Sequence, residues 1–271
     1  MNDISRHYAR PGLGEAILEA LARAGRDTQH LAPEDLAPVD EFHVRGRAAT
    51  LELARAAGVA AAMRVLDVGS GLGGPSRALA REYGCRVSGI DLSADYCGAA
   101  TLLAERSGLA AQVDYRQGDA CALPFPDAAF DLVWTQHAAM NIADKPRCYA
   151  EMHRVLKPGG RLALYDVLAG PAGAPHFPVP WARSPATSFL VTPEALRALL
   201  AQAGFAIANW VDTTEAARGW FARTAERTQR EGAPALSLAL VLGAEFPAMI
   251  ANLRRNLDEG RLAIVQAVAA R

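Results

Sequence analysis

A glycine-rich segment, Asp67-Val-Gly-Ser-Gly-Leu-Gly-Gly74, is the part of the sequence whose residue types and spacing most clearly suggest chemistry. It follows an apolar run and precedes a helical pattern. Gly69, Gly71 and Gly74 fit the spacing G-x-G-x-x-G, in which glycines permit a tight turn and let a nucleotide lie against bare backbone. Glycines also serve strand-to-helix turns that bind nothing. The segment alone therefore leaves a nucleotide site and a structural turn both open.

Two further carboxylates follow at positions that suit a nucleoside. Asp91 ends the next apolar run, about twenty residues after the loop, where an acid accepts hydrogen bonds from ribose hydroxyls. Its alternative role is to cap the following helix, which Ser93 could do instead. Asp119, in Gly118-Asp-Ala120, could accept a proton from an exocyclic adenine amine, or could belong to a plain turn.

The carboxylate of Asp67 separates two nucleotide chemistries, those of a nicotinamide dinucleotide and of S-adenosylmethionine. Asp67 stands two residues before Gly69, at the tip of the preceding strand. A pyrophosphate at that place would be repelled by a like charge at short range. A ligand that carries a sulfonium and an ammonium group would be attracted. The sequence therefore favours S-adenosylmethionine.

The elements that hold these residues alternate between strands and helices. Apolar runs predict strands at residues 64–68, 86–90, 113–117, 130–135, 160–167 and 205–211, with a last strand at 262–269. Helical patterns lie at residues 14–24, 46–57, 75–83, 94–107, 146–155 and 193–203, the last with Thr192 as N-cap and Gly204 as its stop. Residues 213 to about 256 look helical, broken near Gly232 and Pro234, and residues 31–39, with two prolines, are expected to be a loop. This alternation predicts an α/β fold with a parallel sheet.

Several motifs in this order resemble those of class I S-adenosylmethionine-dependent methyltransferases. Residues 65–73 resemble motif I, residues 90–93 the ribose segment, and residues 118–120 with 123–126 the adenine segment. Residues 130–134 are similar to the fourth strand, and residues 154–160 to the turn before the fifth. The resemblance covers Arg64 to about Asp166. It implies a doubly wound, Rossmann-like sheet of seven strands with the last one antiparallel.

Within that family the chain resembles small-molecule enzymes: sarcosine/dimethylglycine, tocopherol and sugar O-methyltransferases. The segments His7-Tyr8 and Phe42-His-Val-Arg-Gly46 are similar to the helical lid of that group. The resemblance implies a lid over residues 1–60 and a methyltransferase domain over residues 61–271, with a helical insertion at about 213–260. It also implies S-adenosylmethionine as cofactor, held by Asp67, Gly69, Ser70, Gly71, Asp91, Leu92, Asp119, Ala120 and Gln136.

The reaction expected from this resemblance is transfer of a methyl group to an amine or hydroxyl of a small metabolite. The cofactor carries the difficult chemistry, so the protein must align the acceptor and exclude water. Two alternatives stay open: a module that binds the cofactor without methyl transfer, including a use of its positive charge in a cyclisation, and an NAD-dependent oxidoreductase.

Candidate substrate-facing residues follow the fourth strand, because the carboxyl ends of parallel strands face the ligand crevice. His137 is the candidate base, and its alternative is a structural ring beside the cofactor. Met140 and Asn141 are expected to line the substrate pocket. Trp181 stands in a proline-rich loop over residues 170–188, which either roofs that pocket or buries Trp181 as a staple.

Composition limits the remaining classes of function. The 271 residues hold 28 Lys and Arg against 29 Asp and Glu, a net charge of −1, which gives no basic footprint for nucleic acid or an anionic membrane. No apolar run of about eighteen residues predicts a membrane span, and the polar N-terminus does not look like a signal peptide. The 4 cysteines are scattered without a metal-binding spacing. We therefore expect a cytoplasmic protein with no metal, whose oligomeric state the sequence does not indicate.

Overall fold

A single sheet of seven strands runs through the molecule, in the order β3-β2-β1-β4-β5-β7-β6. In this computed structural model, residues 10–232 and 236–271 are described. The strands are β1 (Arg64–Val68), β2 (Arg86–Asp91), β3 (Val113–Gln117), β4 (Phe130–Gln136), β5 (Leu156–Ala169), β6 (Ala206–Asp212) and β7 (Leu262–Ala270). Strands β1 to β5 pair in parallel, and β7 runs antiparallel to both β5 and β6. The predicted sheet with its reversed last strand is confirmed.

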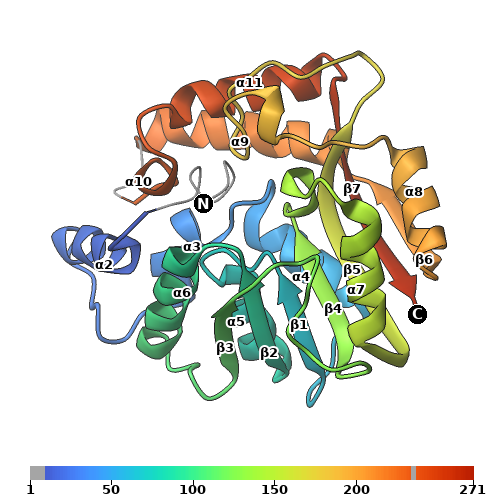
Figure 1. Cartoon of the computed structure of the whole chain (residues 1–271). Coiled ribbons are helices and arrows are strands. Elements are labelled where there is room, and N and C mark those ends of the chain that lie inside the picture. The colour runs from blue at the N-terminus through green and yellow to red at the C-terminus, as the bar shows by residue number, and fades with distance from the viewer. Residues whose placement is uncertain (1–9, 233–235) are drawn as a thin grey trace.

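Helices cover both faces of this sheet (Figure 1). They are α4 (Gly46–Ala57), α5 (Gly74–Tyr83) and α6 (Ala94–Arg106), then α7 (Lys145–Val155) and α8 (Pro193–Gln202). Consecutive buried residues of a strand point to opposite faces: Leu132 and Trp134 join the core beneath α4 and α5, whereas Val133 joins the core beneath α7 and α8. Burial on both faces explains why the central strands, such as β1 and β4, read as continuous apolar runs.

The connections between these elements carry the expected caps. Ser93 Oγ accepts from Tyr96 N at 3.4 Å at the start of α6, and Thr192 Oγ1 accepts from Ala195 N at 3.2 Å at the start of α8. Gly204, with φ of 93°, follows Ala203, the C-cap residue of α8. Such residues form hydrogen bonds with the unpaired backbone groups at a helix end, and they thereby determine where the helix begins or ends.

Two further helices, α2 (Leu13–Arg23) and α3 (Pro33–Asp40), precede α4 in the chain. The prediction of a loop over residues 31–39 is wrong, because α3 occupies most of that range. Pro33 stands at the first helical position, where its missing N–H costs no hydrogen bond, and the Asp35 carboxylate accepts from Ala32 N at 2.9 Å. Leu36 and Val39 are buried against Leu72 in a third core cluster. Tertiary packing thus outweighs the second proline, Pro38.

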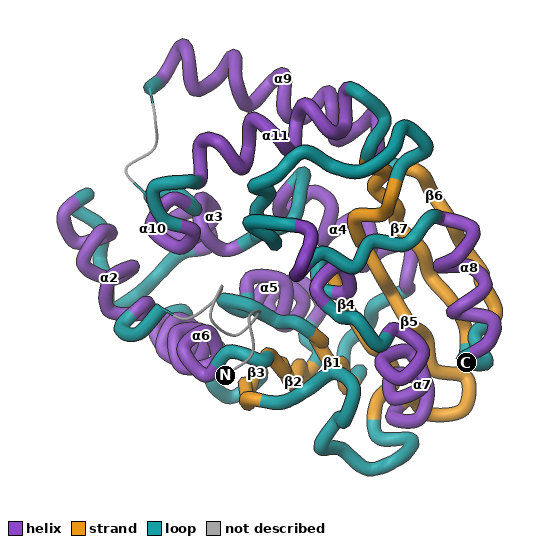
Figure 2. Tube along the Cα trace, turned by 45° about the horizontal axis from the view of Figure 1, so that its top comes forward, coloured by secondary structure: helices purple, strands orange, loops and turns teal. Residues whose placement is uncertain are grey.

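Helical segments between β6 and β7 form the top of the view in Figure 1. They are α9 (Thr214–Glu231), the short α10 (Ala239–Leu242) and α11 (Phe246–Asp258). Figure 2 shows α9 and α11 running side by side. The predicted break falls at Gly232, where α9 ends; Pro234 lies outside the described residues, as do His7 and Tyr8. Within residues 10–232 and 236–271, no helix is both long and apolar enough to cross a bilayer.

Candidate active site

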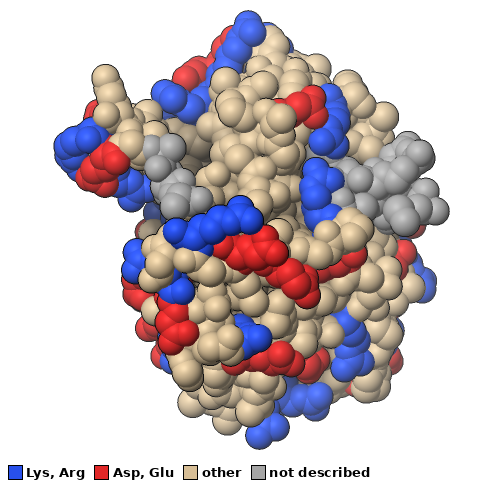
Figure 3. Space-filling view, turned by 90° about the vertical axis from the view of Figure 1, so that its left-hand side faces the viewer, with Lys and Arg blue, Asp and Glu red and all other residues tan. Residues whose placement is uncertain are grey.

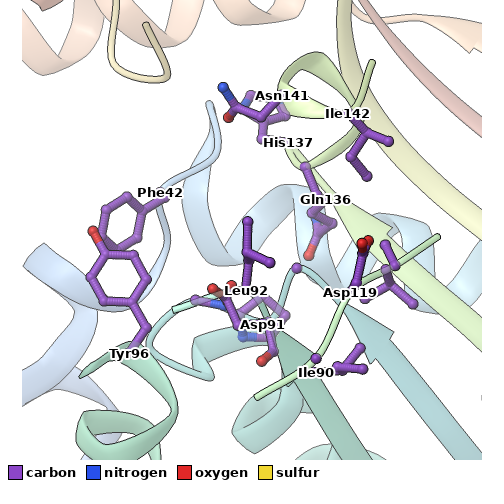
Figure 4. Close-up of a pocket in the computed structure, with 18 of the residues that line it drawn as sticks. Phe42, Ile90, Asp91, Leu92, Tyr96, Asp119, Gln136, His137, Asn141 and Ile142 are labelled. Carbon is purple, nitrogen blue, oxygen red and sulfur yellow. The ribbon is translucent and has the colours of Figure 1, made fainter. Parts of the chain in front are cut away.

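A cavity of about 440 Å³ opens at the carboxyl ends of β1, β2 and β4 (Figure 4). Chain segments far apart in the sequence line it: residues 40 and 42–43 before α4, 68–72 after β1, 90–92 after β2, 118–121 after β3, and 136–138 with 141–144 after β4. Parallel strands bring these segments together, because their carboxyl ends share one edge of the sheet. The cavity is therefore the place where the sequence expected a ligand.

The glycine loop lies against this cavity in a conformation that only glycine adopts readily. Gly69 and Gly71 have φ of 75° and 53°, and Gly69 N donates to Ile90 O at 2.8 Å. A Cβ at Gly69 would collide with the side chain of Ala138, and one at Gly74 with the carbonyl of Asp40. The glycines thus serve both the turn and the close approach of two neighbouring segments, and they leave backbone exposed to the cavity.

Asp91 holds the loop and lines the cavity at the same time. Its Oδ2 accepts from Gly71 N at 3.0 Å and its Oδ1 accepts from Ser93 N at 2.9 Å. Because Ser93 caps α6, Asp91 is not needed for that role. Burial raises the pKa of Asp91, while these backbone hydrogen bonds favour its ionised form. Each carboxylate oxygen keeps a further lone pair for a ligand.

Asp119 stands on the opposite side of the nucleoside-sized space, in the segment after β3. Its Oδ1 accepts from Cys121 N at 2.8 Å, which fixes the turn, and the residue is exposed. Leu92 and Ala120 line the cavity between the two acids. Figure 4 shows Asp91 and Asp119 approaching the cavity from the ends of neighbouring strands. Two carboxylates are thus available to accept hydrogen bonds from a ligand in this space.

Asp67 differs from the other two acids in its surroundings. It is 2% exposed, its Oδ2 accepts from Ser76 Oγ at 2.6 Å, and it does not line the cavity. Burial raises its pKa to about 7, and the neighbouring charge of Asp91 acts in the same direction. The carboxyl group therefore joins β1 to the first turn of α5. Ser70, by contrast, does line the cavity.

Gln136 and His137 end β4 at the cavity wall. Gln136 Oε1 accepts from Trp134 Nε1 at 3.0 Å and lies 3.2 Å from Thr50 Oγ1, whereas its buried Nε2 has no partner among the described residues. An amide donor left in this way is available to a bound ligand. Thr50 belongs to α4, so the amide also connects the N-terminal helices to the sheet.

His137 has a strained backbone and a ring enclosed by other rings. Its φ is 47°, and its ring stacks on Tyr165 with centroids 5.1 Å apart and meets His43 edge-on at 5.9 Å. The Nε2 atom is buried and has no hydrogen-bond partner within the described part of the chain. Burial, helped by the charge of His43, holds the pKa of His137 well below its usual range. The ring is therefore neutral at physiological pH and is a weak base.

The three predicted substrate-binding residues do not share one position. Asn141 lines the cavity, and its Nδ2 donates to the carbonyls of Trp181 and Thr187, both at 2.9 Å. Met140 and Trp181 do not line it; they are 4% and 2% exposed and pack in the core beneath α4. Trp181 Nε1 donates to Ser188 Oγ at 3.0 Å. Asn141 therefore connects the cavity wall to the proline-rich loop, and Trp181 anchors that loop.

Several cavity residues were not predicted as site residues, among them Asp40, Phe42, His43 and Tyr96. Burial raises the pKa of Asp40 to about 6, opposed by its ion pair with Arg77. The rings of Phe42 and Tyr96 lie next to each other on one side of the cavity, with centroids 5.8 Å apart and planes tilted by 49° (Figure 4). The family-like segment at residues 42–46 was the one signal that pointed to this region.

The charges around the cavity have a clear pattern. Among the described lining residues there are acids but no Lys or Arg. The described residues also contain no cluster of three or more metal-binding side chains. On the face shown in Figure 3, acidic and basic side chains are interspersed. The described lining therefore offers no Lys or Arg side chain as an ion-pair partner for a ligand.

Residues 66–164 match the family model described as "Methyltransferase domain". This part of the chain is thus similar to a methyltransferase domain. This match confirms the family resemblance predicted from residues 64–166. A sterol 24-C-methyltransferase of Gibberella zeae is 39% identical over 116 residues, which are 43% of this chain and 30% of that protein. Methyltransferase GfsG of Streptomyces halstedii is 35% identical over 134 residues, 49% of this chain and 48% of that protein. The chain thus spans less than half the length of these relatives.

Solved structures share the whole fold at low identity. Phosphoethanolamine N-methyltransferase 2 of Haemonchus contortus, in complex with S-adenosyl-L-methionine, superposes with a TM-score of 0.76 and 19% identity, over 100% of this chain and 60% of that one. The agreement extends beyond residue 166, where the sequence motifs end, to the reversed strand and the helices before it. The methyltransferase domain described here therefore has the Rossmann-like fold in full.

Proposed function

We propose that this chain binds S-adenosylmethionine in the cavity and transfers its methyl group to an amine or hydroxyl of a small metabolite. The observation that carries the proposal is the arrangement of exposed glycine backbone, Asp91 and Asp119 around one space of nucleoside size. Gly69, Ser70, Gly71, Leu92, Ala120 and Gln136 complete the cofactor-binding side. The names of the relatives and of the superposed structure support the same chemistry.

The bound cofactor supplies an activated methyl group, and the chain supplies alignment and exclusion of water. Asp91 would hold the ribose hydroxyls and Asp119 the adenine amine. The methionyl part would then extend toward residues 136–143, where His137 and Asn141 stand at the cavity wall. In this arrangement Asp67 acts indirectly, by fixing the start of α5 behind the glycine loop through Ser76.

The charge of the cavity narrows the acceptor to an uncharged or cationic molecule. A phosphorylated metabolite would need a cationic partner, and the described lining residues provide no Lys or Arg. The N-terminal segment over residues 1–60 would cover the acceptor, since Phe42 and His43 already form part of the wall. We place the protein in the cytoplasm in this proposal, with no nucleic acid or membrane as partner.

Release of S-adenosylhomocysteine across a panel of amines, phenols and sugars tests the proposal. Turnover of an uncharged or cationic probe, with none for its phosphorylated counterpart, is the expected result. Binding of the cofactor without release from any acceptor would favour a non-methylating module. Binding of NAD in place of the cofactor would favour an oxidoreductase.

A further inference from the structure

A histidine–carboxylate pair from the N-terminal segment reaches the cavity wall. His43 Nε2 lies 2.8 Å from Glu41 Oε2, and the two side chains are 3% and 6% exposed. Only His43 of the pair lines the cavity. Both residues belong to the connection between α3 and α4, and the ring of His43 contacts His137 and Tyr165 edge-on, each with centroids 5.9 Å away. The pair is thus packed against the ends of β4 and β5.

The partners of His43 fix which nitrogen carries the proton. Besides Glu41, Nε2 has Gly46 O at 3.1 Å and Thr50 Oγ1 at 3.1 Å. The Thr50 hydroxyl donates its own proton to Glu41 Oε2 at 2.8 Å, so its oxygen is left to accept. Three acceptors around one nitrogen require that Nε2 bear the hydrogen. Nδ1 then holds the lone pair, and no described residue donates a hydrogen bond to it.

Several charged or titratable groups surround the His43–Glu41 pair. Burial acts to raise the pKa of Glu41, but His43, Thr50 and Arg47 together lower it, so the carboxylate is ionised at neutral pH. Asp67 on β1 adds a second acid within electrostatic reach of His43. His137 after β4 and Tyr165 on β5 complete the surroundings. His137 has no hydrogen-bonded carboxylate among the described residues, and burial makes it a weak base.

We propose that His43, positioned by Glu41, is the proton acceptor of the reaction and that the methyl acceptor is a hydroxyl group. The proposal rests on the methyl transfer proposed above. The acceptor O–H gives its proton to His43 Nδ1 while an oxygen lone pair forms the new O–CH₃ bond. The C–S⁺ bond breaks, and its electron pair stays on sulfur as the neutral thioether. The imidazolium formed is stabilised by Glu41, which a hydroxyl acceptor needs more than an amine acceptor does.

The tautomer can be measured without any acceptor. Histidine labelled with ¹⁵N in the full chain, saturated with S-adenosylhomocysteine, should show His43 as the Nε2–H tautomer at pH 8, assigned by its disappearance in His43→Gln. The Nδ1–H tautomer would overturn the proposal, since Nδ1 could then not accept a proton. Failure of S-adenosylhomocysteine to bind would instead reject the proposed function, so the two failures are distinct.

Kinetics test the role itself. With catechol, 4-nitrophenol or glucose as hydroxyl probe, His43→Gln should lower kcat by about a hundredfold or more and remove the fall of kcat at low pH. Glu41→Gln should lower kcat by about tenfold or more, with affinity for S-adenosylhomocysteine within about threefold in both variants. An acid limb that survives in His43→Gln contradicts the proposal, as does turnover of benzylamine alone.

The chain provides a matched control for these variants. His176 Nε2 lies 2.8 Å from Glu259 Oε2, the same separation as in the His43–Glu41 pair, but neither residue lines the cavity. His176→Gln should leave kcat and its pH profile as in the parent chain. An equal loss of kcat in His176→Gln would show that the effect at His43 is one of folding and would overturn the catalytic assignment.

Discussion

Replacement of Asp91 by alanine should weaken binding of S-adenosylhomocysteine by about a hundredfold or more. The carboxylate is the one acid that both lines the cavity and bonds the glycine loop, through Gly71 N at 3.0 Å. A hydrogen bond to a charged group contributes about 1.5–3 kcal/mol, and two ribose hydroxyls would lose their acceptor. A loss of about 3 kcal/mol corresponds to just over a hundredfold in Kd. Isothermal titration calorimetry measures the change directly.

Two companion variants make the result at Asp91 interpretable. Asp91→Asn keeps one oxygen acceptor and should fall between the parent and the alanine variant. Asp114 on β3 is exposed, accepts from Ser88 Oγ at 2.9 Å and does not line the cavity, so Asp114→Ala should bind as the parent does. The reasoning is refuted if Asp91→Ala keeps its Tm within a few degrees and binds S-adenosylhomocysteine within about threefold of the parent.

Three other variants test the remaining parts of the site. His137→Phe should retain kcat within about tenfold and keep the acid limb of its pH profile, because His137 is a neutral, stacked ring; loss of that limb would make it the base. Asp67→Asn removes a carboxyl whose pKa is about 7 when folded. Because this pKa is higher in the folded than in the unfolded chain, the parent loses stability as the pH rises from about 4 to 7. Measured by urea unfolding, the free energy of unfolding of the variant relative to the parent should therefore rise by up to about 4 kcal/mol over that pH range. A difference that does not vary with pH contradicts this reasoning. Lys145 Nζ donates to the carbonyls of Ala139, Ile142 and Phe189 at 2.8, 2.8 and 2.5 Å. Because these carbonyls would lose their donor, Lys145→Met should lower the free energy of unfolding by about 3 kcal/mol and Tm by about 6–12 °C. An unchanged Tm would show that water replaces the ammonium group.

The sheet and most helices were predictable because their signals are local. Buried strands read as apolar runs, and Ser93 and Thr192 cap their helices through contacts three residues away. The helix α3 was missed because its signal is tertiary. Two prolines within residues 31–39 favour a loop locally, and burial of Leu36 and Val39 against Leu72 decides for a helix.

The residues proposed to hold the cofactor were predictable for the same reason, since each stands at or just after the end of a strand. The residues proposed to face the methyl acceptor were not predictable in this way, because they come from distant segments of the chain. The sequence gives no sign that Glu41 and His43 meet the end of β4, and it leaves Trp181 open between a pocket roof and the buried staple that the structure shows. Such pairings depend on how the N-terminal helices and the proline-rich loop pack on the sheet. A single histidine after β4 therefore drew attention to His137 alone.

A crystal structure of the full chain with S-adenosylhomocysteine is the most direct test of the central claim. The account predicts ribose hydroxyls on Asp91, the adenine amine at Asp119, and the sulfur directed toward His43 and Asn141 at the other end of the cavity. The account is contradicted if the ligand occupies another place on the chain, or if the sulfur points away from these two residues.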